Sequence, residues 1–411
     1  MGQGRVLLLS NGHGEDLSGA LVASALRRRG VAVRALPLVG HGEPYRQRGI
    51  EVVARTRAFS TGGLGFTSLA GQLRELLEGQ TLHVLLQLAG LRRRGRSADL
   101  VVAVGDLVAV LGGWLSGRPA AVYLVAYSSH YEGRLRLPWP CGWLLRRRCF
   151  KAIWARDRLS AEDLSAQLRR PVRFLGNPFL DAALPGADTT PGPAVLEVDP
   201  QQLLLLPGSR LPEAQHNLAL MLDLLPRLAR RLPPPQRLRI RAALVGSLSA
   251  AAIEQLAAPL GWGPAAAAGG TQLLRHGRGL EVELVWADFA AQLAAADLVL
   301  AMSGTASEQA VGLGKPVLQL VGRGPQFTAG FADAQRRLLG PAVIGVNGEP
   351  GSDAGLEATA ALGADLLQRL ADPAQGPALR RLWASTASER IGASGGSERL
   401  AAAIMELLQC P

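Results

Sequence analysis

Short, strongly apolar runs alternate with longer amphipathic segments along almost the whole chain, and this alternation constrains the fold more than any other feature. In the first half we expect strands at residues 6–9, 31–38, 100–104 and 121–125, with a helix at 17–29 between the first two. Strands and helices that alternate in this way form a parallel sheet with helices on its faces. The sequence therefore predicts an α/β fold.

The same rhythm starts again after residues 184–200, which are rich in proline, glycine and threonine. There we expect a helix at 213–232 and strands at 203–206, 238–245, 280–285, 298–302 and 316–321. A chain of 411 residues, 48% of them hydrophobic, can bury two cores. We predict domains at 1–183 and 201–390, the linker 184–200, and a C-terminal segment, 391–411, whose helix packs back on the first domain.

The positive charge of the chain is confined to its first half. Residues 1–181 contain 26 Lys and Arg against 13 Asp and Glu, whereas residues 182–411 contain 18 against 20, and the net charge is +11. This asymmetry favours an acidic partner for the first half, either an anionic membrane surface or nucleic acid. A soluble, arginine-rich surface is the alternative explanation.

The sequence also indicates where the protein works. Its cysteines, Cys141, Cys149 and Cys410, are too few and too scattered for a disulfide framework or a zinc cluster, which predicts a reducing compartment. No export signal precedes the first apolar run. The long apolar stretch at 99–117 contains Asp106 and paired glycines, so we expect a buried strand and helix there rather than a membrane span.

Three junctions between a strand and the next helix carry residues that could do chemistry. The first, at 10–19, places small and titratable residues at the carboxyl end of a strand, where ligands of α/β proteins bind. Its glycines would let a ligand approach backbone N–H groups, and its ionisable side chains could transfer protons. The candidates are Asn11, Gly12, His13, Gly14, Glu15 and Asp16. A capped helix start is the alternative explanation.

The second junction is a turn of Gly208 and Ser209 that ends in Arg210, a side chain able to bind a diphosphate through two N–H groups. A solvated arginine would give the same pattern. The third junction passes through a Ser-Gly-Thr turn, 303–305, into a helix whose positive end attracts anions. Its candidate residues are Ser303, Gly304 and Thr305, and a simple Ser/Thr cap is the alternative.

Asp106 interrupts the otherwise apolar run 100–110. An ionised carboxylate within a buried strand carries a large desolvation cost, so we expect Asp106 at the end of that strand. There it could accept the proton of a substrate hydroxyl or orient His13 as the base. The alternative is that Asp106 caps a helix that begins near Leu107.

The motifs at these junctions resemble those of lipid-A-disaccharide synthases. The stretch LLPGSRLPEAQHNLALML, at 205–222, is similar to the PGSR-x-x-E helix start of that family, and SGTASEQAVGLGKPV, at 303–317, and FLGNPFLD, at 174–181, add to the likeness. The resemblance implies two Rossmann-like domains of the GT-B glycosyltransferase architecture. It also implies a UDP-sugar bound mainly by the second domain, an acyl-sugar acceptor bound mainly by the first, and no metal or other cofactor.

The resemblance assigns roles to several residues. Arg210 and the 303–305 turn would lie at the donor diphosphate, and Asp106 would match an aspartate considered important for catalysis. The ribose-binding glutamate of the family falls on Gln309, with Glu308 one position earlier. Because the first loop, NGHGED, departs from the GE-x-SGD of the family, we interpret the chain as a divergent member.

The leading hypothesis is an inverting glycosyltransferase that moves a hexosyl group from a UDP-sugar to a lipid or lipid-linked acceptor at the cytoplasmic face of a membrane. Asp106, His13 and Asp16 are the candidate bases. A nucleotide-sugar epimerase of the same fold and a non-catalytic nucleotide-sugar-binding protein are the alternatives. Nucleic-acid binding is disfavoured, because no reading module or aromatic platform is recognised.

An apolar series between Phe66 and Leu88 is followed by three arginines, 92–94. Apolar residues next to a basic cluster are typical of interfacial surfaces, which predicts peripheral membrane association through the first domain. A core helix with a solvated basic end is the alternative.

Overall fold

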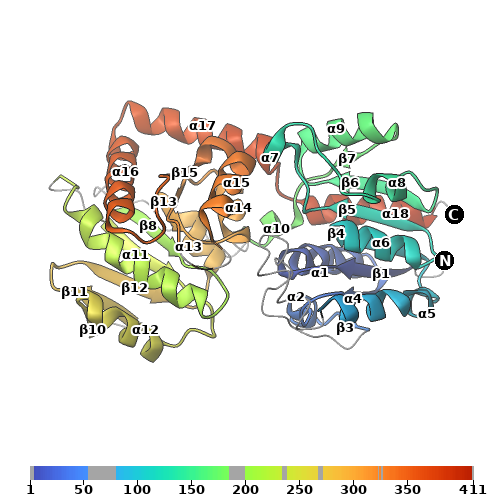
Figure 1. Ribbon diagram of the computed structural model, residues 1–411, viewed down its shortest axis with the longest axis horizontal. Coiled ribbons are helices and arrows are strands. Elements are labelled where there is room, and N and C mark those ends of the chain that lie inside the picture. The colour runs from blue at the N-terminus through green and yellow to red at the C-terminus, as the bar shows by residue number, and fades with distance from the viewer. Residues whose placement is uncertain are drawn as a thin grey trace. The chain divides into compact units, whose positions relative to one another are not determined.

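The computed structural model describes residues 4–53, 80–184, 200–233, 238–266, 272–322, 324 and 327–409. The chain divides into two compact units (Figure 1). The first unit contains residues 1–182 and 392–411, and the second contains residues 183–391.

The described part of the first unit is built on a parallel sheet with the strand order β3-β2-β1-β4-β5-β6-β7. Its strands are β1 Arg5–Ser10, β2 Ala32–Pro37, β3 Glu51–Val52, β4 Leu100–Gly105, β5 Ala120–Leu124, β6 Phe150–Ala155 and β7 Arg173–Phe174. The central strands are apolar at almost every position because helices cover both faces of the sheet. In β1, Val6 and Leu8 project into one core, whereas Leu7 and Leu9 project into the other.

The helices of the first unit pack on both faces of the sheet (Figure 1). They are α1 His13–Arg28, α2 Glu43–Arg46, α4 Gln80–Ala89, α5 Leu91–Gly95, α6 Leu107–Leu115, α7 Ser129–Glu132, α8 Cys141–Leu145, α9 Arg158–Leu168, α10 Pro178–Asp181 and α18 Gly396–Gln409.

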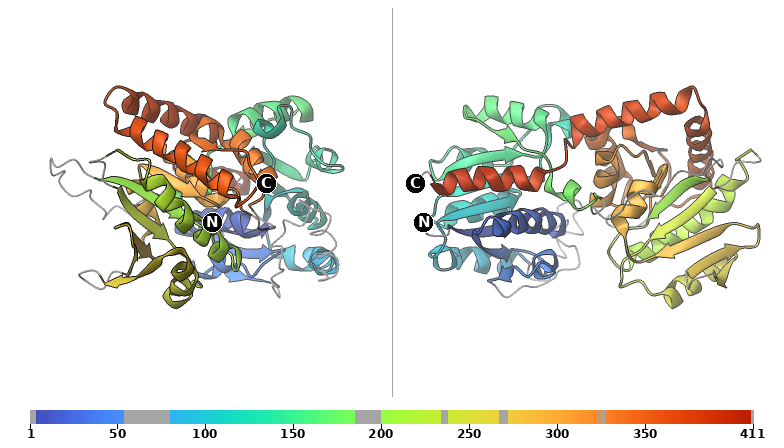
Figure 2. Two further views of the ribbon diagram at one scale, coloured as in Figure 1. Left: turned by 60° about the vertical axis from the view of Figure 1, so that its left-hand side comes forward. Right: turned by 180° about the vertical axis from the view of Figure 1, so that it is seen from behind.

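The C-terminal helix α18 belongs to the first unit and lies alongside α1 (Figure 2). Its apolar side, including Leu400 and Ile404, is buried in the core that α1 shares with the sheet. At its start, Glu398 pairs with Arg28 and Arg29 at 2.5 and 2.8 Å. Burial of the apolar side supplies most of the stabilisation, since exposed ion pairs contribute little.

The sheet of the second unit has the order β10-β11-β12-β9-β8-β13-β14-β15 within the described residues. Its strands are β8 Gln201–Leu206, β9 Leu238–Ala243, β10 Trp262–Ala266, β11 Gln272–His276, β12 Glu281–Val285, β13 Leu298–Ala301, β14 Val317–Gln319 and β15 Val343–Gly345. All pairs are parallel except β10 with β11 and β11 with β12, which are antiparallel.

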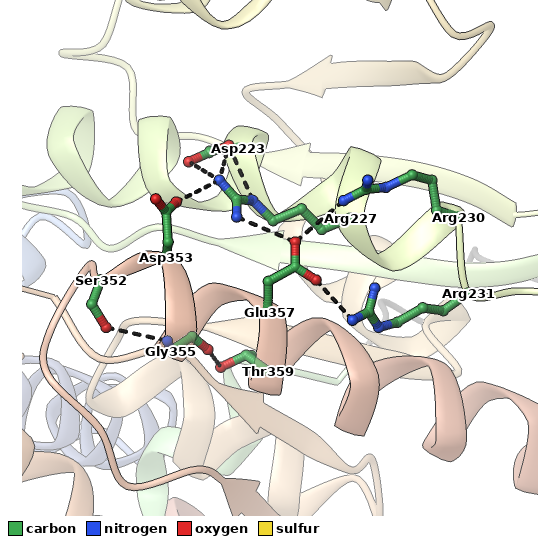
Figure 3. A network of polar contacts seen from close by, with 9 residues as sticks. All are labelled: Asp223, Arg227, Arg230, Arg231, Ser352, Asp353, Gly355, Glu357 and Thr359. Atoms are coloured by element: carbon green, nitrogen blue, oxygen red, sulfur yellow. Dashed lines mark hydrogen bonds and ion pairs between the residues drawn. The ribbon is translucent and has the colours of Figure 1, made fainter.

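The helices of the second unit are α11 Glu213–Ala229, α12 Ala250–Ala257, α13 Phe289–Ala295, α14 Thr305–Gly312, α15 Ala329–Leu339, α16 Asp353–Ala371 and α17 Gln375–Arg390, with short 3₁₀ turns η2 Ala258–Leu260 and η4 Gly340–Ala342. Helices α11 and α16 pack side by side, and a polar network joins them (Figure 3). At its centre, Glu357 of α16 pairs with Arg227, Arg230 and Arg231 at 3.3, 3.2 and 2.8 Å.

The structure differs from the sequence expectations in several places, and strands β3, β6, β7 and β15 were not expected. Helix α1 begins at His13, four residues before the predicted start, and Glu15 in its first turn is favourable near the positive end of the helix. The antiparallel hairpin of β10 and β11 was not predicted. Most of the apolar series between Phe66 and Leu88 lies outside the described residues, and Leu88 itself is buried in the core.

Among the described residues, no helix combines the length and the apolar character that crossing a bilayer requires. The stretch at 99–117 forms β4 and α6, as expected from Asp106 and the glycines within it.

The network around Glu357 predicts a salt-sensitive contribution to the stability of the second unit. Glu357→Gln removes one charge that three arginines share, so we expect the free energy of unfolding to fall by about 1 kcal/mol at low salt. The loss should shrink in 1 M salt. Thermal or urea unfolding measures it, with Glu254→Gln on the exposed side of α12 as the control. An equal effect of both variants would contradict the role of the network.

Candidate active site

The ends of β1 and β4 bring two candidate residues of the first unit together. The strands pair in parallel with Ser10 opposite Val104, so the residues that follow them leave the sheet at the same edge. There, the side-chain amide of Asn11 donates to both carboxylate oxygens of Asp106 at 3.1 Å. The carbonyl oxygen of Asn11, Oδ1, is buried and has no hydrogen-bond partner among the described residues.

Asp106 has an extended backbone and caps the N-terminus of α6. Its Oδ1 accepts from the backbone N–H groups of Val108 and Ala109 at 2.9 and 3.4 Å. The structure therefore contains the helix cap, which was the alternative to a catalytic role for Asp106. Burial raises the pKa of Asp106 above its ordinary value, and the bonds from Val108, Ala109 and Asn11 oppose that increase. Within the described chain, Oδ2 accepts only from Asn11.

Gly105 lets the turn after β4 approach the turn after β1. Its φ of +140° is unfavourable for other residues. A Cβ atom at Gly105 would stand 3.4 Å from Cγ of Glu15 and 3.8 Å from Cβ of Asn11. The half-buried Glu15 thus lies over the end of β4, close to Asp106.

Asp16 lies apart from this group, inside the core. Its side chain is only 2% exposed and accepts a hydrogen bond from the Ser10 hydroxyl at 2.5 Å. The hydroxyl of Tyr45 donates in turn to Ser10 at 3.0 Å. Burial raises the pKa of Asp16 to about 8, and the nearby charge of Glu15 adds to this, while the Ser10 hydrogen bond opposes it. Asp16 is therefore placed to hold the turn rather than to contact a substrate.

Gly12 and Gly14 flank the start of α1, and Gly12 occupies its N-cap position without a side-chain cap. Residue His13 opens the helix, but its side chain lies outside the described part of the structure. The prediction that Asp106 orients His13 therefore stays a prediction.

In the second unit, the turns after β8 and β13 adjoin each other. These strands are neighbours in the sheet, and the backbone N–H of Met302 donates to the Leu206 carbonyl at 3.0 Å. Gly208 has φ of +110°, and a Cβ there would stand 3.3 Å from the Met302 carbonyl oxygen. The side-chain amide of Asn217 donates to the Pro207 carbonyl at 2.8 Å and fixes the first turn from the side of α11.

The Ser-Gly-Thr turn is held by side chains that bind its carbonyl groups. Gln335 of α15 donates to the carbonyls of Ser303 and Gly304 at 3.1 and 3.3 Å, and the Ser307 hydroxyl donates to Ser303 at 2.7 Å. Gly304 is the N-cap of α14, and no side chain caps this helix. Its first N–H groups, beginning with that of Thr305, lack the partners that a longer preceding turn of helix would provide.

The remaining candidates of the second unit differ in accessibility. Ser209 is exposed, and Arg210 and Glu308 are half-buried. Gln309 is 5% exposed and belongs to the buried residues of α14. Of the two residues considered for the ribose, Glu308 is thus the more accessible. The carbonyl of Arg210 accepts from the Ala214 N–H at 2.8 Å, which ties this turn to the first turn of α11.

Sequence reasoning missed Tyr45, Gln335 and Tyr127. The hydroxyl of Tyr127 accepts a hydrogen bond from the Leu107 N–H at 3.0 Å. A signal for Tyr45 is Gly19, because a side chain on α1 at that position would clash with the Tyr45 hydroxyl. No comparable signal marks Gln335, which lies 30 residues after the turn that it binds.

Among the described residues, no cluster of His, Cys, Asp and Glu could hold a metal ion.

No protein-family model and no curated protein sequence matches this chain. Solved structures match it over nearly its full length. The calicheamicin glycosyltransferase CalG4 is 18% identical, with a TM-score of 0.60, and the match covers 100% of this chain and 99% of that one. MurG of Acinetobacter baumannii is 16% identical, with a TM-score of 0.58 and coverage of 98% and 99%.

A third similar structure is the UDP-GlcNAc 2-epimerase of Neisseria meningitidis, solved bound to UDP-GlcNAc. It is 16% identical, with a TM-score of 0.54 and coverage of 99% and 100%. At these identities the likeness shows the fold alone. The chain therefore has the α/β, two-domain GT-B architecture, and the predicted fold class is confirmed.

The burial of Asp16 predicts a pH-dependent stability. The folded chain holds its proton up to about pH 8, whereas the unfolded chain releases it near the ordinary value of 3.8, so native stability falls as the pH rises between these values. Asp16→Asn stays neutral, so we expect its stability relative to the unmodified protein to increase between about pH 4 and pH 8 and to level off above pH 8.

Urea unfolding at several pH values measures this difference. The control is Asp99→Asn, because the hydrogen bond from Arg5 lowers the pKa of Asp99 and moves its titration to acid pH. A pH profile of Asp16→Asn that parallels that of the unmodified protein would contradict a protonated Asp16.

Proposed function

We propose that this protein is a glycosyltransferase that uses a UDP-sugar donor. The observation that carries the proposal is the adjacency of two glycine-containing turns at the carboxyl ends of β8 and β13. One turn contains Gly208 and leads to Arg210, and the other opens α14 without a side-chain cap. A diphosphate needs this combination of a cationic side chain and backbone N–H groups at a helix start.

In this proposal the second unit binds the donor. Arg210 and the N–H groups that follow Gly304 neutralise the diphosphate, which becomes the leaving group. Gln335 and Ser307 support the Ser-Gly-Thr turn, because their hydrogen bonds to its carbonyls keep its N–H groups in place for the anion. Glu308 is half-buried on α14 and accepts hydrogen bonds from the ribose hydroxyls.

The first unit binds the acceptor and supplies the base. Asp106 has one oxygen occupied by the N-terminus of α6, and the other, Oδ2, accepts only from Asn11 within the described chain. That oxygen can take the proton of the acceptor hydroxyl as it attacks the anomeric carbon, and a pKa raised by burial makes Asp106 a stronger base.

The finer parts of the proposal come from the sequence motifs. Their resemblance to lipid-A-disaccharide synthases supports transfer of a hexosyl group, with inversion, to a lipid or lipid-linked acceptor. The basic first half supports a peripheral position at the cytoplasmic face of a membrane. The comparisons of structure support the GT-B fold and include both glycosyltransferases and an epimerase.

Donor binding is tested with UDP itself. Arg210→Ala removes charge-assisted hydrogen bonds to the diphosphate, so we expect UDP binding to weaken by about 1.5–3 kcal/mol. Calorimetry measures the change, and Arg278→Ala, in the exposed turn after β11, is the matched control. Unchanged UDP affinity in Arg210→Ala would remove this residue from the site.

Catalysis by Asp106 is tested with Asp106→Asn, which keeps the size and much of the capping ability. If Asp106 is the base, turnover falls by about 100-fold or more while folding and UDP binding persist. The matched control is Asp157→Asn, because Asp157 caps α9 by accepting from the Ser160 N–H. That variant should lose some stability and little turnover per folded molecule. Comparable turnover in both variants would leave Asp106 with the capping role alone.

One assay separates the two enzymatic alternatives. The protein is incubated with UDP-GlcNAc, with and without a lipid extract, and the products are identified by NMR. Release of UDP that depends on the extract supports the transferase, whereas a 2-epimer formed without any acceptor supports the epimerase. UDP binding with neither product supports a non-catalytic nucleotide-sugar-binding protein.

A further inference from the structure

Three tryptophans of the first unit lie at its surface. Trp139 precedes α8 and is 89% exposed, Trp143 within α8 is 47% exposed, and Trp114 near the end of α6 is 40% exposed. The rings of Trp114 and Trp143 pack edge to face, with their centroids 6.2 Å apart. Side chains of this size are normally buried for most of their area, so such a group on a surface indicates a partner.

Arginines without a carboxylate partner among the described residues lie next to these tryptophans in the sequence, and one of them contacts a ring. The guanidinium of Arg147 lies 3.6 Å from the centre of the Trp143 ring. Residues 133–151 contain five arginines, one lysine and no acidic residue. Within the described chain no ion pair is recorded for Arg146, Arg147 or Arg148, whereas Arg28 of the same unit pairs with Glu398. The surface thus combines apolar rings with positive charge that no carboxylate of the described chain neutralises.

A second basic segment adjoins the same surface. The side chain of Arg92, in α5, comes within 3.8 Å of the Cβ position at Gly117, in the turn that follows Trp114. We call the three tryptophans together with Arg92 and Arg146–Arg148 the Trp–Arg surface. Favourable placement of arginines at helix C-termini explains some of the charge, since α5 and α8 end there. It does not explain why the tryptophans are exposed.

We infer that the Trp–Arg surface docks on an anionic phospholipid bilayer. Tryptophan rings are favourable at the level of the lipid headgroups, and each basic residue near the surface is attracted by anionic lipid. The charge of the surface is complementary to such a bilayer. The inference names the partner of the proposed function, but docking itself does not require that function, because no residue of the donor site belongs to the surface.

Single-stranded nucleic acid fits this surface less well. Binding of that kind uses open aromatic faces on which bases stack. Here Arg147 covers one face of Trp143, and Trp114 packs against the same ring. Trp139 stands between Pro138 and Pro140 as the one widely exposed ring of the group. A single exposed ring is suited to insertion among lipid headgroups, whereas a run of stacked bases needs several exposed rings.

The test is co-sedimentation of the full chain with vesicles at low salt. One vesicle is phosphatidylcholine alone, and the other contains phosphatidylglycerol in addition. We expect binding to the anionic vesicle only, reduced about tenfold by Trp139→Ala with Trp143→Ala. Removing two charges, by Arg146→Gln with Arg148→Gln, should weaken partitioning roughly 30-fold. The control combines Leu159→Ala, a side chain 43% exposed on α9, with the exposed Arg173→Gln, and should bind as the unmodified protein does.

Several outcomes would overturn the inference. These are absence of binding to anionic vesicles, equal binding to both vesicles, and equal losses in the surface and control variants. Retention on single-stranded RNA or self-association that only the surface variants lose, without vesicle binding, would assign the surface to those partners instead. Trp139→Ala alone remains informative if the double variant unfolds, because this side chain makes little contact with the core.

UDP affinity, measured on the same variants, separates this inference from the proposed function. Vesicle binding that depends on the Trp–Arg surface, in a protein that does not bind UDP, would support docking and contradict the glycosyltransferase. UDP binding by a protein that does not bind anionic vesicles would support the glycosyltransferase and contradict docking.

Discussion

The parallel pairing of β1 with β4 is the constraint on which the candidate chemistry of the first unit depends. The register places Ser10 opposite Val104, and the residues that follow these strands meet as the Asn11–Asp106 contact. Burial of the strands on both faces specifies this register, because a slip of one residue would exchange the sides of every apolar residue. The position of one carboxylate is therefore set by the hydrophobic core beneath it rather than by polar contacts alone.

In the second unit, too, the pairing of neighbouring strands brings two turns together, but these turns carry different groups. Strands β8 and β13 are neighbours, so the turns that follow them adjoin, and Gly208 allows the backbone of one turn to approach that of the other. Gln335 then fixes the Ser-Gly-Thr turn through its carbonyl groups. The first unit thus presents a carboxylate at its sheet edge, and the second presents N–H groups and an arginine. In the proposed function, that carboxylate is the proton acceptor, and the arginine and N–H groups bind the diphosphate.

The alternating apolar runs were sufficient to predict the fold class and the central strands of both sheets, because parallel strands covered on both faces are apolar throughout. They did not predict β6 or the hairpin of β10 and β11. The placement of Asp106 at a strand end followed from the cost of burying a charge. The partners of Asp16 could not be predicted in this way. Tyr45 reaches Ser10 from a separate segment, and only the packed structure brings the two hydroxyls and the carboxyl together. Long-range contacts between side chains leave no periodic signal in the sequence.

Helix α6 links the two proposals for the first unit. Asp106 caps its N-terminus, and Trp114 lies in its last turn. A rise of 1.5 Å per residue separates them by about 12 Å along the helix axis. A bilayer bound at the Trp–Arg surface would therefore lie about two helical turns from the carboxylate. An acceptor anchored in that bilayer must extend its sugar beyond the headgroups to reach Asp106. This geometry favours acceptors whose reactive hydroxyl stands on a sugar or a phosphate-linked spacer over lipids whose hydroxyl lies at the acyl boundary.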